Sequence, residues 1–72
     1  MSEWIYDEAT QKRQALIAAG YEEWQTLGDV NKFGWAKKGS EWNEWITRFN
    51  SHQQALSYAY QMVIKSGREL SN

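Results

Sequence analysis

The clearest hydrophobic pattern lies near the end of the chain, where apolar residues recur every three or four positions. The repeating positions are Ala55, Leu56, Ala59, Tyr60 and Val63. This spacing places them on one face of an amphipathic helix. Ser51 precedes the pattern with Gln54 three residues later, as in a capping box, and Gly67 follows it. The pattern predicts a helix over about residues 51–66.

The first part of the chain also has helical character. Residues 11–19 are rich in good helix formers, and Gly20 follows them at a position where helix ends favour glycine. The apolar positions on one helical face are Ile5, Ala9, Leu16 and Ala19. We predict a helix over about residues 3–19, with Tyr21 packing back on Leu16.

The middle of the chain favours strands. Gly28, Gly34 and Gly39 break it into short pieces, since glycine inside a helix costs about 1 kcal/mol relative to alanine. Aromatic and β-branched residues fill residues 33–36 and 42–47, as is typical of half-buried strands.

A tight turn at Lys38 and Gly39 would join these two strands into a β-hairpin. Gly39 would then adopt the positive φ that such turns require, and Trp35 would lie opposite Trp42 as a cross-strand pair. Residues 21–27 are a candidate third strand.

A helical interpretation of the same region competes with this one. The positions Trp42, Trp45, Ile46 and Phe49 also follow helical spacing, with Ser40 as a cap. One helix over about residues 41–66, packed on the first, would give an all-α helical hairpin. We prefer strands, because Asn50 and Ser51 suit a strand-to-helix junction better than a helix interior.

The expected fold is therefore α+β, in a single domain over residues 1–72. It has an N-terminal helix, a β-hairpin or three-stranded antiparallel sheet, and a C-terminal helix packed on the sheet. The all-α helical hairpin is the alternative. Hydrophobic residues make up 42% of the chain and charged residues 24%, as in ordinary globular proteins.

Aromatic side chains are the most unusual part of the composition. The 72 residues include five tryptophans, four tyrosines and two phenylalanines. A domain of this size buries only about 60% of the surface of its unfolded chain, so it cannot enclose all five indoles. We expect the remaining aromatic surface to bind a partner. The expected contact residues are Trp35, Trp42 and Trp45, flanked by Lys37, Lys38 and Arg48.

Other chemistry has little support in the sequence. Cysteine is absent, His52 is the one histidine, and the glycines have no phosphate-loop spacing. The serines lack the glycine-flanked turn that exposes a catalytic serine. We therefore expect no catalytic residue, no cofactor site and no metal site, and hence no enzyme. No apolar run reaches the roughly 20 residues that span a bilayer, so we expect a cytoplasmic protein without a membrane partner.

Charge is unevenly distributed around a net value of −1. Residues 1–29 hold six acidic and two basic side chains, whereas residues 30–65 hold five basic and two acidic ones. Residues 32–38 combine lysines with two aromatic residues, which is the basis of an alternative function. In this alternative, Trp and Phe rings stack on nucleic-acid bases beside Lys and Arg. The acidic overall balance disfavours it.

The preferred function is a non-enzymatic protein-interaction module that docks on another protein, or on itself, through exposed aromatic surface. Cofactor-free chains of this size are frequent among the accessory and inhibitor proteins of phages and mobile elements. Such an origin is therefore among the expectations.

Overall fold

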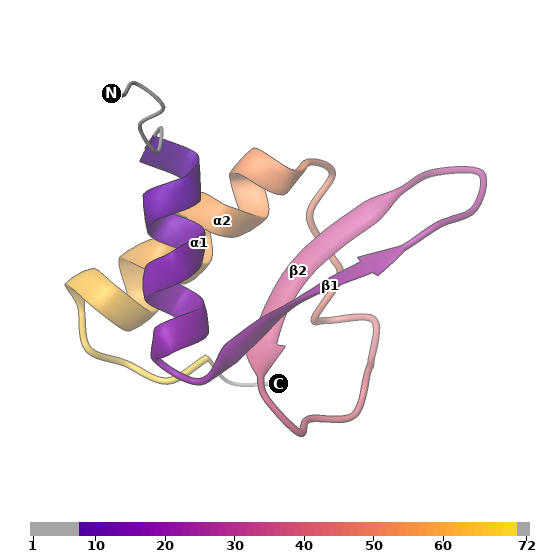
Figure 1. Cartoon of the computed structure of the whole chain (residues 1–72). Coiled ribbons are helices and arrows are strands. Elements are labelled where there is room, and N and C mark those ends of the chain that lie inside the picture. Colours follow the sequence, from indigo (N-terminus) through magenta and orange to yellow (C-terminus); the bar gives the residue numbers. More distant parts are fainter. Residues whose placement is uncertain (1–7, 71–72) are drawn as a thin grey trace.

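Two helices and a two-stranded antiparallel sheet form the fold, and a computed structural model describes residues 8–70 (Figure 1). The elements are α1 (Glu8–Ala18), β1 (Tyr21–Thr26), β2 (Lys32–Lys37), α2 (His52–Tyr60) and a short π-helix, η1 (Gln61–Lys65). This order confirms the predicted α+β class and contradicts the all-α alternative. Trp4, Ile5 and the predicted helix start at residue 3 lie outside the described residues.

Local signals determine where the helices end. Gly20, just after α1, has a φ of 95°, and Gly67, just after η1, has a φ of 67°. Glycine adopts this left-handed region without a steric penalty. At the start of α2, the Ser51 Oγ accepts a hydrogen bond from the Gln54 backbone N–H at 3.1 Å. The predicted helix ends are thus confirmed. Within residues 8–70, no helix is long and apolar enough to cross a membrane.

The hairpin is present, but not where the sequence predicted it. β1 pairs with β2, with Tyr21 opposite Lys37, and residues 27–31 connect the two strands. Residues 21–27, the candidate third strand, therefore supply one of the two strands of the hairpin. Gly39 does take a positive φ of 92°, but residues 40–48 after it form neither a strand nor a helix.

The predicted cross-strand pair of two tryptophans is therefore wrong. Trp35 lies opposite Glu23 in the register, and Trp42 belongs to the irregular segment that follows β2. The physical reason is that β2 already has β1 as its partner on one edge. On the other edge, the one pairing of β2 within residues 8–70 is a bridge between Phe33 and Phe49.

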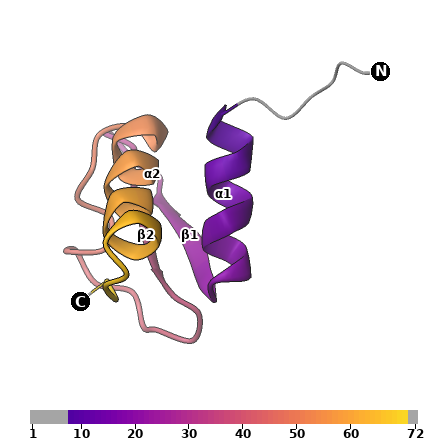
Figure 2. The ribbon, with the colours of Figure 1, turned by 90° about the vertical axis from the view of Figure 1, so that its left-hand side faces the viewer.

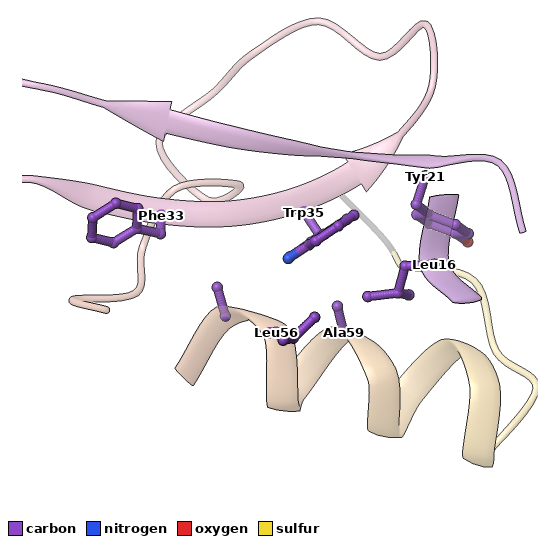
Figure 3. Close-up of a cluster of buried hydrophobic side chains, with 7 residues drawn as sticks. Leu16, Tyr21, Phe33, Trp35, Leu56 and Ala59 are labelled. Carbon is purple, nitrogen blue, oxygen red and sulfur yellow. The ribbon is translucent and has the colours of Figure 1, made fainter. Parts of the chain in front are cut away.

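The core lies between the helices and one face of the sheet. Figure 2 shows α1 and α2 side by side, with the strands behind them. The buried cluster consists of Leu16, Tyr21, Phe33, Trp35, Ala55, Leu56 and Ala59. Burial of each large apolar side chain contributes about 1.5–3 kcal/mol. In Figure 3, the side chain of Trp35 lies between β2 and the α2 residues Leu56 and Ala59.

Candidate functional site

The segment after β2 crosses the face of the sheet that the helices leave open. Ile46 is buried, and its carbonyl oxygen would lie 1.6 Å from a Cβ atom placed on Gly34. Only a residue without a side chain permits this approach of one backbone to another. Gly34 therefore positions the crossing segment on β2.

Asn43 fixes the shape of this segment. Its Oδ1 atom accepts hydrogen bonds from the backbone N–H of Trp45 at 2.9 Å and of Ile46 at 3.2 Å. Asparagine commonly stabilises turns in this way, by bonding to the backbone two residues further on. In a strand, these N–H groups would bond to a neighbouring strand. The side chain of Asn43 thus holds a turn over residues 44–47 in place of the predicted strand.

The turns direct two tryptophans to the surface. Trp42 is 45% exposed and Trp45 is 56% exposed. The Nε1 atom of Trp42 donates a hydrogen bond to the Oγ1 atom of Thr47, a buried residue, at 2.9 Å. Trp42 is therefore held at its polar edge while part of its ring surface contacts solvent.

Arg48 organises the aromatic rings around it. Its Cζ atom lies 3.9 Å from the centroid of Trp45, 4.5 Å from that of Phe49 and 4.9 Å from that of Tyr58. Its Nη1 atom donates a hydrogen bond of 2.7 Å to the backbone carbonyl of Trp45. Cation–π contacts of this kind contribute about 0.5–1 kcal/mol each at exposed sites. We call these four residues, Trp45, Arg48, Phe49 and Tyr58, the Arg48 cluster.

The Arg48 cluster joins three parts of the fold. Trp45 comes from the crossing segment, Phe49 is bridged to β2, and Tyr58 comes from α2. The rings of Phe49 and Tyr58 also lie 5.3 Å apart, between their centroids. The sequence-based list of contact residues omitted both. Tyr58 lies outside the buried stripe of its helix, and this position was the signal in the sequence that could have identified it as a surface residue.

Trp35 does not belong to the exposed surface. It is only 4% exposed, because it points from β2 into the core (Figure 3). Its expected role as a contact residue is therefore corrected: it is a core residue. Phe33, two residues earlier on the same face of β2, is also buried.

The two lysines lie apart from the cluster. The Nζ atom of Lys37 forms an exposed ion pair with the Oε2 atom of Glu69, at 3.0 Å. The hydrogen bond that Lys37 donates to Glu69, and then the charge of Glu69, raise the pKa of Lys37 above its ordinary value of 10.5. Lys38 is exposed at the turn after β2. Lys37 is at the opposite end of β2 from Phe33, about 13 Å along the strand. The structure therefore joins Arg48, but neither lysine, to the exposed rings.

A cleft of about 600 Å³ lies at a second place, between α1, α2 and β1. Glu23 accepts a hydrogen bond there from Arg13 at 3.0 Å, and its Oε2 atom lies 2.9 Å from the Nδ1 atom of His52. His52 also stacks at 4.0 Å on Phe33. Sequence reasoning missed the pairing of His52 with Glu23. Because 29 residues separate the two, no local pattern indicates this contact.

The cleft can hold a charged network, but its carboxylate is already neutralised. Arg13 binds one oxygen of Glu23 and His52 contacts the other. Among residues 8–70, no three His, Cys, Asp or Glu side chains are grouped so that they could hold a metal ion.

Comparisons with known proteins add no functional assignment. No protein-family model, no curated protein and no solved structure matches this chain. A candidate function has to come from the residues themselves, and the exposed tryptophans around Arg48 are their most distinctive arrangement.

Proposed function

We propose that this protein is a non-enzymatic interaction module that docks on a partner protein through Trp42 and the Arg48 cluster. The observation that carries the proposal is the exposed ring of Trp45, with the guanidinium of Arg48 stacked 3.9 Å from its centroid. Trp, Tyr and Arg are the residue types that most often dominate binding energy at protein interfaces.

The cluster suits binding because its side chains are already ordered. Immobilising a flexible side chain at an interface costs about 0.5–1.5 kcal/mol. Arg48 is held by three rings and by one hydrogen bond to the carbonyl of Trp45, so much of this cost does not recur on docking. A guanidinium has five N–H donors. Those not used by the Trp45 carbonyl are suited to carbonyl or carboxylate oxygens of a partner.

Nucleic-acid binding receives less support from the same geometry. That alternative depended on the lysines and aromatic residues of residues 32–38. Phe33 and Trp35 are buried in the core, so their ring faces are not accessible to bases. Lys37 is paired with Glu69. Among the described residues, stacking would have to come from other exposed rings, such as Trp42, Trp45 and Tyr58.

Affinity capture from the protein's native cells tests the proposal. Wild type, Trp45→Ala and Ile17→Ala would serve as baits, since Ile17 is an exposed apolar residue on α1. We expect a stoichiometric partner with wild type and Ile17→Ala that is lost with Trp45→Ala. Calorimetry with the purified partner should then show at least a tenfold weaker affinity for Trp45→Ala, equivalent to about 1.4 kcal/mol.

The controls address folding and the alternative ligand. Trp45 is exposed, so Trp45→Ala should retain the circular dichroism of wild type. A partner that binds wild type and Trp45→Ala equally well would contradict the proposal. Tryptophan fluorescence that is quenched by single-stranded oligonucleotides, with steep loss at higher salt, would favour nucleic acid instead.

A further inference from the structure

The outer edge of β1 carries backbone groups that the sheet does not use. The Lys38 N–H donates a 2.8 Å hydrogen bond to the carbonyl of Gly20, which lies directly before β1. Hydrogen-bonded pairs alternate with non-bonded pairs along an antiparallel ladder. The next bonded positions on β1 are therefore Glu22, Trp24 and Thr26. The backbone N–H and C=O groups that point away from β2 are those of Tyr21, Glu23 and Gln25.

The far edge of β2 confirms this alternation. Phe33 lies opposite Gln25, at a position that is non-bonded between the two strands. Its N–H and C=O groups accordingly point away from β1 and bond to Phe49, at 2.9 and 3.2 Å. The edge of β2 is thus partly covered, whereas no hydrogen bond joins the outward groups of β1 to another described residue.

β1 carries two glutamates, Glu22 and Glu23, but lacks several other features that protect an edge strand. Its six residues include no proline and no lysine, and its register with β2 runs without a bulge. Natural proteins use such features to prevent strand addition. The hairpin tip beyond β1 projects away from the helices in Figure 1, and Leu27 there is 72% exposed.

We propose that β1 pairs antiparallel with β1 of a second copy of the chain, which joins the two two-stranded sheets into a four-stranded one. The interface is isologous, since a two-fold axis relates the same strand in both copies. It is separate from the Arg48 cluster, which contacts β2 and α2 rather than β1.

The side chains favour one register. When Trp24 lies on the two-fold axis, it faces Trp24 of the partner subunit. Glu23 of one copy and Gln25 of the partner subunit then form a hydrogen-bonded pair. Glu22 of one copy lies opposite Thr26 of the partner subunit. No like charges are directly opposed, and an aromatic pair forms at the centre. A register centred on Glu23 would instead oppose two carboxylates, which is destabilising.

Two further features fit this register. Arg13 and His52 already contact the carboxylate of Glu23, which reduces, without removing, the repulsion between its charge and the partner. Leu27, exposed in one copy, comes to lie opposite Tyr21 of the partner subunit. Both the backbone groups and the side chains of a second copy of β1 therefore fit the outer edge of β1.

Sedimentation over a wide concentration range, combined with hydrogen exchange, tests the proposal. Wild type should dimerise reversibly. The amides of Glu23 and Gln25 should exchange at least tenfold more slowly in the dimer than in the monomer. The amides of Glu22 and Trp24, which already bond to β2, provide an internal control and should change much less. A chain that stays monomeric at every concentration would overturn the proposal.

Substitutions of Gln25 test the register. Gln25→Glu places a second carboxylate opposite Glu23 of the partner subunit and should raise the dimer dissociation constant at least fivefold. Gln25→Lys places a cation there and should lower it. Gln25 is exposed and its N–H points outward, so both variants should keep the fold of the monomer. Equal dimer dissociation constants for the two Gln25 variants would refute this register. Trp45→Ala, which alters the Arg48 cluster and not β1, should leave dimerisation unchanged.

Discussion

At the scale of single residues, the surroundings of a glycine decide what it contributes. Gly28 and Gly34 both have φ values outside the left-handed region, so the backbone angles at these two positions do not require glycine. Their surroundings differ: nothing lies within 4 Å of a Cβ on Gly28, whereas a Cβ on Gly34 would overlap the carbonyl of Ile46.

Gly34→Ala should therefore destabilise the protein, by about 3 kcal/mol or more, because the crossing segment must move off β2. Gly28→Ala is the matched control and should be neutral or stabilise the fold by up to about 1 kcal/mol, through a less flexible unfolded chain. Urea denaturation of the two variants measures both effects. Equal midpoints would mean that the segment after β2 does not pack on Gly34.

The ion pair of Lys37 and Glu69 has a defined pH dependence. The pKa of Lys37 is raised in the folded protein, so the pair stabilises the fold below the ordinary value of 10.5. This contribution is lost as the pH rises through the folded pKa. In Glu69→Gln, we expect an NMR titration of the Lys37 side chain to show a lower pKa than in wild type. Because both side chains are exposed, the change in stability should be small. An unchanged pKa would show that the pair does not form in solution.

At the scale of elements, α2 depends on a local signal at its start. The Ser51 side chain accepts the N–H of Gln54, one of the N–H groups that have no partner within the helix. Ser51→Ala should lower the free energy of unfolding by about 1 kcal/mol. Ser57→Ala, at an exposed position in the same helix, is the control and should not destabilise it. Thermal and urea unfolding measure the stability of both variants. Equal stabilities would show that the Ser51 cap does not stabilise the protein.

Signals of this local kind explain which elements the sequence could predict. The cap at Ser51 and the glycines after both helices act within a few residues, so α2 and the end of α1 were predicted correctly. The strand character of residues 21–27 and 33–36 was also recognised. The choice of strand partner was not predictable in the same way, because aromatic residues on both sides of Gly39 fit a sheet equally well.

The candidate site was predictable only in part, for the same reason. The surplus of tryptophan indicated exposed aromatic surface, and Trp42 and Trp45 are exposed. Which tryptophan joins the core depends on the face of β2 that meets the helices, and the sequence does not specify that face. Trp35 was assigned to the wrong side on this account. The stacking of Arg48 on Tyr58 requires the crossing segment to reach α2, which no sequence spacing encodes.

At the scale of the whole molecule, one buried side chain anchors α1 in the core. Leu16 is its single buried residue among those described, and it packs in the same cluster as Trp35 and Leu56. The ion pair between Arg13 and Glu23 is partly exposed and adds little. The attachment of α1 should therefore depend on one leucine side chain.

Leu16→Ala should cost about 2–5 kcal/mol, through lost burial and the cavity that remains. A domain of this size has a total stability of roughly 4–11 kcal/mol, so the loss is large enough to release α1 or to unfold the chain. Ile17→Ala, at the adjacent exposed position, is the matched control and should change stability by less than about 0.5 kcal/mol. Hydrogen exchange distinguishes the outcomes, because release of α1 alone would expose its amides while those of α2 stay protected. If Leu16→Ala were as stable as Ile17→Ala, the core would not extend to α1, and the cleft between the helices would lack a fixed wall.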